Sequence, residues 1–564
     1  MAEGSVVPAT GRPRAEAGAA ARWLPWLLVL LVLVAAVPAI VAMPPIDRDE
    51  TRFAQATRQM LETGDYVAIY FQDEPRNKKP VGIHWLQAAS VGLFSSPKAA
   101  EIWAYRIPSL AGAVGAVLVL LLLGRRLFGE RVGALAALLM AGCLAVQVEA
   151  LMAKTDAVLL LTILTAQLAL AEIWQRSQRD GPESWAGAEW RALFWVMLAA
   201  GVLIKGPLAP LVVGATILAL SIVEHRWRWL GRLSPLWGLP LFLALVLPWF
   251  LFVTFLRDTG FVGEAASKDL VAKIVGGEES HGMPPGFYLG AHLLFFFPGA
   301  LFALPAVLAA WRRRKQEAPL RFCLAWLLPT WIFFEVMPTK LPHYVLPTYP
   351  ALALLTAWAV TTALPELRRR WVYGLHGLIG LGALGLAAAA IALPILAEAG
   401  FLWQSVVVAV ILVVGVGGTL GLAWQGRQQP ALIWGAVAGA LFFGWTTSAV
   451  LPRLDKVFPA EILVAEWRRL QPSDEPPLAS TGFHEPSLVF LAGTETKLIN
   501  PAGSARYLKE QPTAIAMVAD RQLKRFLRAS FHELMLPIPL AQLRIFNYSN
   551  GIWEQITYFG RSLR

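Results

Sequence analysis

Charged side chains that could do chemistry gather in a few short polar segments between long apolar runs. Asp49 and Glu50 follow the first apolar run, Lys78 and Lys79 come later in the same polar segment, and Asp156 opens another apolar run. A lysine ammonium is a compact point charge that binds a phosphate and stabilises it as a leaving group. A carboxylate held nearby can orient an attacking hydroxyl or accept its proton. Together these residue types favour transfer of a group away from a phosphate.

Further candidates lie in three other polar segments. Lys205 belongs to a Lys-Gly-Pro tripeptide, Lys340 and Tyr344 belong to the stretch TKLPHY, and Lys273 lies in residues 257–285. Lone ionisable groups near hydrocarbon are costly and are often functional. A sugar donor built on a lipid phosphate would place its phosphate at the membrane surface, beside these lysines. Its polyprenyl tail would then lie against the apolar runs.

Each of these residues also fits a structural role. Asp49 and Asp156 stand where aspartate commonly caps the start of a helix. Lys79, Lys205 and Lys340 could anchor apolar runs at the membrane surface, with the ammonium group reaching toward water. The residue types alone leave both interpretations open.

Neither a metal site nor a disulfide framework is expected. Glu278, Glu279 and His281 resemble a metal cluster, but their spacing matches no specific ligand pattern, so a hydrated loop is the preferred interpretation. Cys143 and Cys323 both lie inside apolar runs. We therefore expect that the chain requires no metal and no other cofactor.

A long series of apolar runs must position these polar segments. The chain has 564 residues, of which 56% are hydrophobic and 15% are charged, whereas soluble proteins have roughly 25% charged residues. Apolar runs long enough to cross a hydrocarbon core of about 30 Å recur between residues 24 and 450. Thirteen spans are expected, at about residues 24–43, 104–123, 132–148, 157–174, 192–204, 207–223, 234–256, 286–310, 320–337, 341–363, 372–396, 402–424 and 431–450. The predicted fold class is an all-α polytopic membrane protein.

Arginine and lysine cluster after every second span, as the positive-inside rule predicts. This distribution explains the net charge of +11 without a nucleic-acid partner. It makes residues 1–23 a cytoplasmic tail and residues 44–103 and 257–285 outer loops of a transmembrane domain, residues 24–452. Because the number of spans is odd, residues 453–564 are expected to form a soluble domain on the outer side.

Two outer segments have recognisable secondary-structure patterns. Residues 51–64 have the apolar spacing of a helix, which predicts a helix lying on the membrane surface. In the C-terminal segment, Leu488–Ala492 and Ala514–Val518 resemble strands, and the run FNYSNGIWEQITYF has an Asn-Gly pair typical of a hairpin. A small α/β domain is expected there.

A transporter or flippase is the main alternative from another functional class. Such proteins carry ionisable groups near the bilayer midplane, broken helices and repeated halves. Here the middle of each expected span is nearly free of charge, and the sequence has no visible internal repeat. A structural or assembly protein is a third interpretation, which predicts that loss of Asp49 is tolerated.

Several longer motifs resemble a known enzyme family. The run IDRDETRFAQATRQMLETGDY followed by NKKPVGIHW is similar to the first outer loop of the bacterial aminoarabinose transferase (ArnT-like) enzymes. These enzymes belong with the protein O-mannosyltransferases in the GT-C class of glycosyltransferases. The stretch TKLPHYVLPTYPALALL resembles a second family signature, and KTDAVLL and KGP fit two more. The resemblance covers about residues 24–450 in matching order.

The resemblance implies a bundle of about thirteen spans and transfer of a sugar, with inversion, from a polyprenyl phosphate carrier. Carried over by motif, Asp49 resembles the essential acidic residue of the family, and Asp156 resembles its second acid. Lys79 resembles the lysine that contacts the carrier phosphate, and Tyr344 a tyrosine near that phosphate. Lys273 stands where relatives have a basic residue.

The resemblance also gives expectations for acceptor and location. Lipid A or a related envelope glycolipid is the first expected acceptor, reached at the periplasmic face of a bacterial inner membrane. A protein O-mannosyltransferase-like activity is the alternative within the class. Lys78 departs from the family, because close aminoarabinose transferases tend to have glutamate before the phosphate-binding lysine. Glu50, Lys205 and Lys340 are further site candidates.

Overall fold

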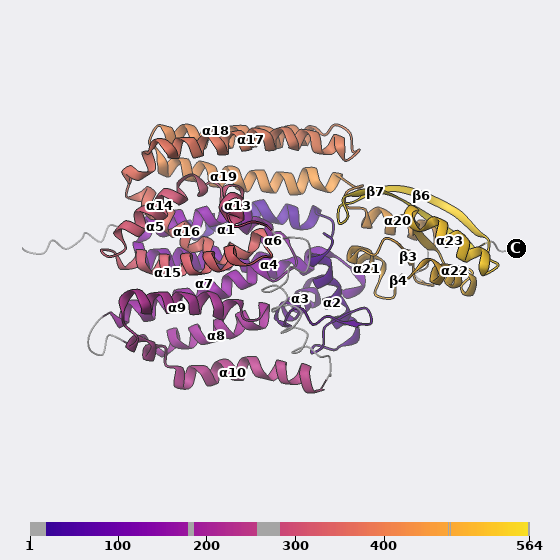
Figure 1. Ribbon diagram of the computed structural model, residues 1–564, viewed down its shortest axis with the longest axis horizontal. Coiled ribbons are helices and arrows are strands. Elements are labelled where there is room, and N and C mark those ends of the chain that lie inside the picture. Colours follow the sequence, from indigo (N-terminus) through magenta and orange to yellow (C-terminus); the bar gives the residue numbers. More distant parts are fainter. Residues whose placement is uncertain (1–18, 179–184, 257–282, 472, 474, 562–564) are drawn as a thin grey trace, which may run out of the picture.

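Long helices that run side by side form one body of the protein, and a smaller α/β domain sits at one end of it (Figure 1). The computed structural model describes residues 19–178, 185–256, 283–471, 473 and 475–561. The helices of the bundle are α1 (Ala19–Ala42), α4 (Ile102–Phe128), α5 (Glu130–Gly142), α6 (Leu144–Leu151), α7 (Asp156–Ser177), α8 (Ala188–Lys205), α9 (Leu208–Glu224), α10 (Pro235–Leu251), α13 (Phe287–Phe295), α14 (Ala300–Arg313), α15 (Ala318–Val336), α16 (Tyr349–Thr361), α17 (Arg370–Leu396), α18 (Trp403–Trp424) and α19 (Gln428–Trp445).

The bundle has the helix lengths and composition of a polytopic membrane protein. Among the described residues, nine helices are long and apolar enough to cross a membrane. A tenth is added if α5 and α6, which meet at a bend of 56°, count as one span. All thirteen expected spans fall mainly on helical backbone, and the three that are not among these ten candidates fall on α8, on α9 and on the pair α13 and α14. The predicted fold class is confirmed.

Small residues let the helices that carry the site approach each other closely. Gly112 in α4 faces the start of α7, where an added Cβ would lie only 2.8 Å from the backbone nitrogen of Val158. Small residues at such crossings are common in membrane bundles, because close backbone contact maximises van der Waals packing. Gly112 therefore lets α4 lie in direct backbone contact with the first turn of α7.

Two helices outside the bundle join it to the C-terminal domain. They are α2 (Asp49–Thr63) and α3 (Gly82–Phe94), and the short hairpin of β1 (Tyr70–Phe71) and β2 (Glu74–Pro75) lies between them in sequence. The predicted helix over residues 51–64 is confirmed. Its apolar face, however, does not lie on lipid: Ala54 packs in one buried cluster with Tyr105 of α4 and Phe490 of the C-terminal domain. The domain covers the face that composition alone assigned to the membrane.

The C-terminal domain is a five-stranded sheet with four helices. The strands are β3 (Ala479–Thr481), β4 (Lys497–Leu498), β5 (Ala516–Ala519), β6 (Pro537–Asn547) and β7 (Ile552–Arg561), and the helices are α20 (Ala460–Leu470), α21 (Pro486–Ala492), α22 (Pro501–Glu510) and α23 (Asp520–His532). The strand order is β4-β3-β5-β7-β6; β3 is parallel to β4 and β5, and the other pairs are antiparallel. The predicted hairpin is confirmed as β6 and β7, and the predicted strand at Ala514–Val518 overlaps β5.

The predicted strand at Leu488–Ala492 is wrong, because these residues belong to α21. Pro486 stands in the first turn of that helix, where its fixed φ angle suits helical backbone. Ser487, Leu488, Val489 and Phe490 are all buried, so the helix is buried on several faces. A short apolar run of this kind does not distinguish a strand from a buried helix.

Candidate active site

A cluster of buried charges surrounds the first residue of α7. Lys205, the last residue of α8, donates from Nζ to Oδ1 of Asp156 over 2.6 Å. Lys154 lies in the turn before α7, with its Nζ 3.0 Å from Oε1 of Glu149 and 3.9 Å from Oδ2 of Asp156. Asp156, Lys154 and Glu149 are all less than 10% exposed. The end of α6, the start of α7 and the end of α8 therefore meet as one network of ion pairs.

A further part of the chain, the segment Pro342–Thr348, joins this network. Nε2 of His343 lies 3.9 Å from Oδ1 of Asp156. Its ring packs edge-on against Tyr344, with the centroids 5.0 Å apart, and Nζ of Lys205 lies 6.0 Å from the centroid of the Tyr344 ring. The structure thus brings together three of the predicted residues, Asp156, Lys205 and Tyr344.

The first outer loop reaches the same cluster. Asp49, the first residue of α2, is exposed and lies within electrostatic range of Lys154. Lys79, in the turn between β2 and α3, is partly exposed and lies within electrostatic range of His343. Burial lowers the pKa of Lys154, but the carboxylates of Glu149 and Asp156 outweigh this effect and raise that pKa above its ordinary value. That ammonium group is therefore charged at any physiological pH.

The structure bears on the structural interpretation of Asp49. Arg48, not Asp49, occupies the position before the first turn of α2, with a φ angle of 69°. Within the part of the chain that is described, no side chain caps this helix. The Asp49 carboxylate is exposed and therefore accessible to a substrate.

Glu50, by contrast, points into the protein and forms a fully buried ion pair. Its Oε2 lies 2.8 Å from Nη2 of Arg106 in α4, and both side chains are 0% exposed. Arg106 donates from all five of its N–H groups: two bonds reach Glu50, and three reach the carbonyl oxygens of Ile40, Met43 and Pro44. This arginine fastens the end of α1 and the start of α2, so Glu50 has a structural place rather than a place among the reactive groups.

Lys340 bonds to backbone carbonyl groups rather than to the charged cluster. Nζ of Lys340 is buried and donates to the carbonyl oxygens of Met283 and Met337 over 3.0 and 2.7 Å, so it ties the end of α15 to the segment before α13. Lys273 lies outside the described residues, as do Glu278, Glu279 and His281. In the described ranges, no group of three or more His, Cys, Asp or Glu side chains has the arrangement of a metal site.

Sequence reasoning missed two of the charged residues. Arg106 lies within an expected span, and Glu149 stands just after the end of another. The signal that could have found them is the cost of a lone charge near hydrocarbon. Because of that cost, a charged residue in a span has either a structural partner or a function. In the structure, Arg106 forms an ion pair with Glu50, and Glu149 forms one with Lys154.

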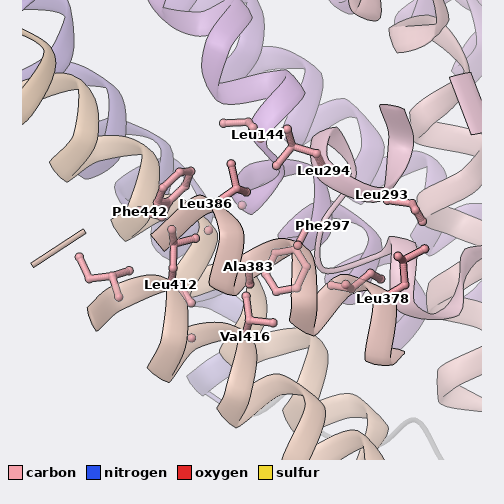
Figure 2. A pocket seen from close by; sticks show the side chains of 17 residues that line it. Leu144, Leu293, Leu294, Phe297, Leu378, Ala383, Leu386, Leu412, Val416 and Phe442 are labelled. Atoms are coloured by element: carbon pink, nitrogen blue, oxygen red, sulfur yellow. The ribbon is translucent and has the colours of Figure 1, made fainter. Parts of the chain in front are cut away.

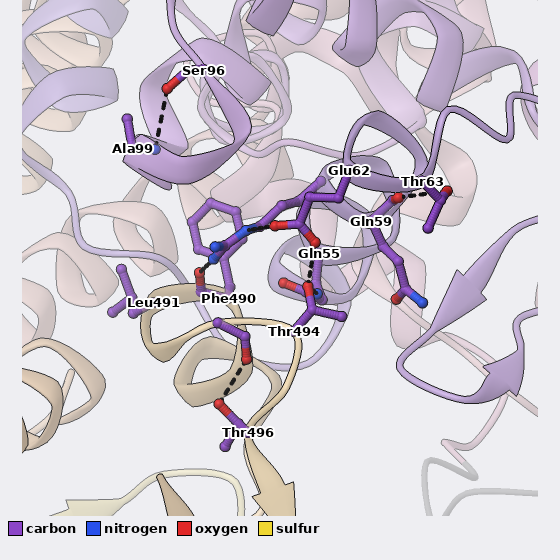
Figure 3. A network of polar contacts seen from close by, with 12 residues as sticks. Gln55, Gln59, Glu62, Thr63, Ser96, Ala99, Phe490, Leu491, Thr494 and Thr496 are labelled. Carbon is purple, nitrogen blue, oxygen red and sulfur yellow. Dashed lines mark hydrogen bonds and ion pairs between the residues drawn. The ribbon is translucent and has the colours of Figure 1, made fainter. Parts of the chain in front are cut away.

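The C-terminal domain forms hydrogen bonds directly with α2. Nη1 of Arg58 donates to the carbonyl oxygen of Phe490 over 2.6 Å, and Nε2 of Gln55 donates to Oγ1 of Thr494 over 2.8 Å. The Thr494 hydroxyl in turn donates to Oε2 of Glu62 over 2.6 Å. Figure 3 shows Gln55 and Glu62 of α2 pointing toward Thr494, in the loop that follows α21. The helix that begins at Asp49 is therefore held between the bundle and this domain.

An apolar groove opens in the bundle near this cluster. Its volume is about 280 Å³, and side chains of α6, α13, α17, α18 and α19 line it, Leu144, Leu293, Leu412 and Phe442 among them (Figure 2). Leu144 begins α6, and Glu149 lies five residues farther along the same helix. At 1.5 Å per residue this separation is about 8 Å along the helix axis. A single short helix thus links the groove to the charged cluster.

Comparisons with known proteins give the family. Residues 78–252 match the family model described as dolichyl-phosphate-mannose-protein mannosyltransferase. The undecaprenyl phosphate-α-4-amino-4-deoxy-L-arabinose arabinosyl transferase of Pseudomonas aeruginosa UCBPP-PA14 is 30% identical over 418 residues, which cover 72% of this chain and 71% of that protein. The enzyme of the same name from Yersinia pestis Pestoides F is 28% identical over 403 residues, covering 70% and 66%.

Solved structures agree on the fold. The apo structure of ArnT from Cupriavidus metallidurans superposes with a TM-score of 0.74 at 19% identity, over 96% of this chain and 98% of that one. The same protein bound to undecaprenyl phosphate gives a TM-score of 0.74 at 18% identity, again over 96% and 98%. The chain belongs to the undecaprenyl phosphate-4-amino-4-deoxy-L-arabinose arabinosyl transferase family, and it is a multi-span membrane glycosyltransferase that uses a polyprenyl phosphate donor.

Proposed function

We propose that the protein transfers 4-amino-4-deoxy-L-arabinose from undecaprenyl phosphate to a phosphate group of lipid A or a related envelope glycolipid. The observation that carries this proposal is the meeting of Asp156, Lys205 and His343 from separate helices, within electrostatic reach of Lys79. The names of the relatives supply the donor and the sugar.

Lys79 is the proposed principal ligand of the donor phosphate. It is partly exposed at the edge of the cluster, where a donor phosphate can reach it, and it lies within electrostatic range of His343. Tyr344 lies beside Lys205 and adds a hydroxyl donor on the same side. Lys273, outside the described residues, is proposed as a second basic ligand, and Lys78 as a contact to the sugar or the acceptor. The undecaprenyl chain would follow the apolar groove that Leu144 and Phe442 help to line.

The proposed reaction is a single displacement at the anomeric carbon. An oxygen of the acceptor attacks that carbon from the side opposite the donor phosphate, and the bond from the carbon to the phosphate oxygen breaks, so the configuration inverts. Undecaprenyl phosphate leaves with a second negative charge, which fixed ammonium groups stabilise. Asp49 orients the acceptor; a phosphate acceptor is already ionised, whereas a hydroxyl would give its proton to Asp49. No metal and no other cofactor takes part.

We further propose that the enzyme lies in the bacterial inner membrane with its N-terminus in the cytoplasm and the C-terminal domain in the periplasm. Arginine-rich loops at every second turn of the chain support this orientation. The charged cluster and the C-terminal domain would then share the periplasmic side, because α2 contacts both.

A reconstituted transfer assay tests the proposed function. Purified protein in liposomes receives radiolabelled undecaprenyl phosphate aminoarabinose and lipid A, and mass spectrometry identifies the product. We expect a sugar added to a lipid A phosphate, at a rate that chelation by EDTA leaves unchanged. Undecaprenyl phosphate mannose with an acceptor protein forms the comparison arm. Transfer in that arm alone would replace the proposal with a protein mannosyltransferase.

A further inference from the structure

In the segment that carries Lys154 and Asp156, backbone N–H and C=O groups need hydrogen-bond partners from other parts of the chain. Residues 152–155 interrupt the path from α6 to α7, and Met152 has extended φ and ψ angles. Peptide groups at such a break lose helical partners and need others. The Ala153 N–H donates to Oε1 of Glu50 over 2.8 Å, and the Ala153 carbonyl accepts from Nε2 of Gln87 over 3.0 Å. Side chains from the first outer loop thus hold both sides of this one residue.

Gln87 is itself held by a chain of hydrogen bonds that has only one possible direction. Since its Nε2 donates to Ala153, its Oε1 must accept, and the partner of that oxygen is the Thr57 hydroxyl at 2.7 Å. The Thr57 proton is then committed, so the Thr57 oxygen must accept from Nδ1 of His84, also at 2.7 Å. The network therefore assigns the proton of neutral His84 to Nδ1.

Because these three side chains are buried, each depends on its neighbour for a hydrogen-bond partner. Thr57 and Gln87 are 0% exposed and His84 is 1% exposed. Burial and the nearby Arg76 charge lower the pKa of His84 to about 3, which keeps its ring neutral as the relay requires. A buried donor or acceptor that loses its partner carries the full penalty of desolvation. Breaking the Thr57 link leaves Oε1 of Gln87 buried without a donor, and this removes the contact that fixes the orientation of the amide bonded to the Ala153 carbonyl.

We propose that His84, Thr57 and Gln87 are positioning residues that lock the turn before Asp156 to the helix that begins at Asp49. Thr57 lies in α2, whose first residue is Asp49, and Gln87 reaches from α3 to the turn that holds Lys154. The relay thereby sets the separation between the two carboxylates across which the donor and acceptor must meet. This inference rests on the proposed transfer reaction, because it assigns no chemistry of its own.

A matched set of variants tests the relay. Thr57→Val keeps the shape of the side chain but removes the hydroxyl, whereas Thr57→Ser keeps the hydroxyl. Thr330→Val is the control, since Thr330 is buried in α15 and its hydroxyl bonds to no other described residue. A misplacement of about 1 Å can lower a rate about 100-fold, so we expect Thr57→Val to lower kcat by about that factor while KM for the donor stays within about twofold. Thr57→Ser and Thr330→Val should retain kcat.

A second measurement does not depend on activity. Hydrogen–deuterium exchange of the peptide that covers residues 152–156 should be faster in Thr57→Val than in wild type and unchanged in Thr57→Ser. Unchanged exchange in Thr57→Val would overturn the inference whatever the assay shows. A loss of thermal stability with unchanged kcat would also overturn it, because the relay would then be structural only. If exchange is faster in Thr57→Val but the wild-type protein transfers no sugar from the donor, the proposed function is contradicted and the locking of the turn is still supported.

Discussion

Replacing Arg106 by lysine should destabilise the protein far more than its conservative chemistry suggests. Arg106 uses all five N–H donors, on two oxygens of Glu50 and on three backbone carbonyls, and no part of its side chain reaches solvent. A lysine ammonium has only three donors. Arg106→Lys therefore loses at least two of these five hydrogen bonds, although the Glu50 oxygens keep the N–H groups of Ile46 and Ala153 as donors.

The size of the effect follows from those lost hydrogen bonds. A hydrogen bond to a charged group contributes about 1.5–3 kcal/mol, which gives about 3–6 kcal/mol for two of them. Arg106→Met removes the charge as well, leaves the Glu50 carboxylate buried without a counter-charge, and should cost at least as much. The double variant Arg106→Met with Glu50→Gln should recover part of that loss, because it removes the uncompensated charge.

The assay is thermal inactivation of the detergent-solubilised protein, followed by the loss of monodisperse material. The matched control is Arg469→Lys, since Arg469 is 65% exposed in its ion pair with Glu466 and such pairs contribute about 0–1 kcal/mol. We expect Arg106→Lys to inactivate much faster than Arg469→Lys. Equal inactivation rates for Arg106→Lys and wild type would refute the claim that this arginine fastens α1 and α2 to the bundle.

Three further perturbations have defined outcomes. Lys205→Ala should lower kcat about 100-fold, since it leaves Asp156 without its 2.6 Å partner, whereas Lys205→Arg should lose less; equal rates in steady-state transfer would contradict this. Burial raises the pKa of Asp47 to about 6, so the folded form binds its proton more tightly than the unfolded form with the ordinary value of 3.8. Its stabilising contribution is full below pH 3.8 and is lost as pH rises to 6; at about 1.4 kcal/mol per pH unit this is about 3 kcal/mol, which Asp47→Asn should abolish in unfolding measured against pH. Leu412→Trp narrows the apolar groove and should raise KM for the undecaprenyl donor without changing kcat, while a donor with a short prenyl chain should be unaffected.

Patterns along the chain predicted the elements well, because their causes are local. Length and apolar composition decide whether a helix crosses a membrane, so the expected spans fall on helices. The Asn-Gly pair at residues 550–551 predicted the turn between β6 and β7, because these two residue types adopt the backbone angles that tight hairpin turns require. The short apolar run at Leu488–Ala492 failed because its helical state depends on burial against α2 and α20.

The candidate site was only partly accessible from the sequence, because ion pairing is a tertiary property. The motifs nominated Asp156 and Lys205, but only the fold shows that their side chains bond to each other. Glu50 stands beside Asp49 in sequence, yet one turns inward to Arg106 and the other stays exposed. Adjacent residues on a helix face different directions, so a motif cannot say which carboxylate meets the substrate.

The rate of sugar transfer in Asp49→Asn protein tests the central claim most directly. The claim is that carboxylates and ammonium groups from separate segments form one site for transfer from a polyprenyl phosphate. Asp73→Asn is the matched control, since Asp73 is exposed in the turn between β1 and β2 of the same loop. In a single-turnover assay with saturating donor, we predict a loss of about 100-fold or more for Asp49→Asn and none for Asp73→Asn. Equal single-turnover rates for the two variants would contradict the account.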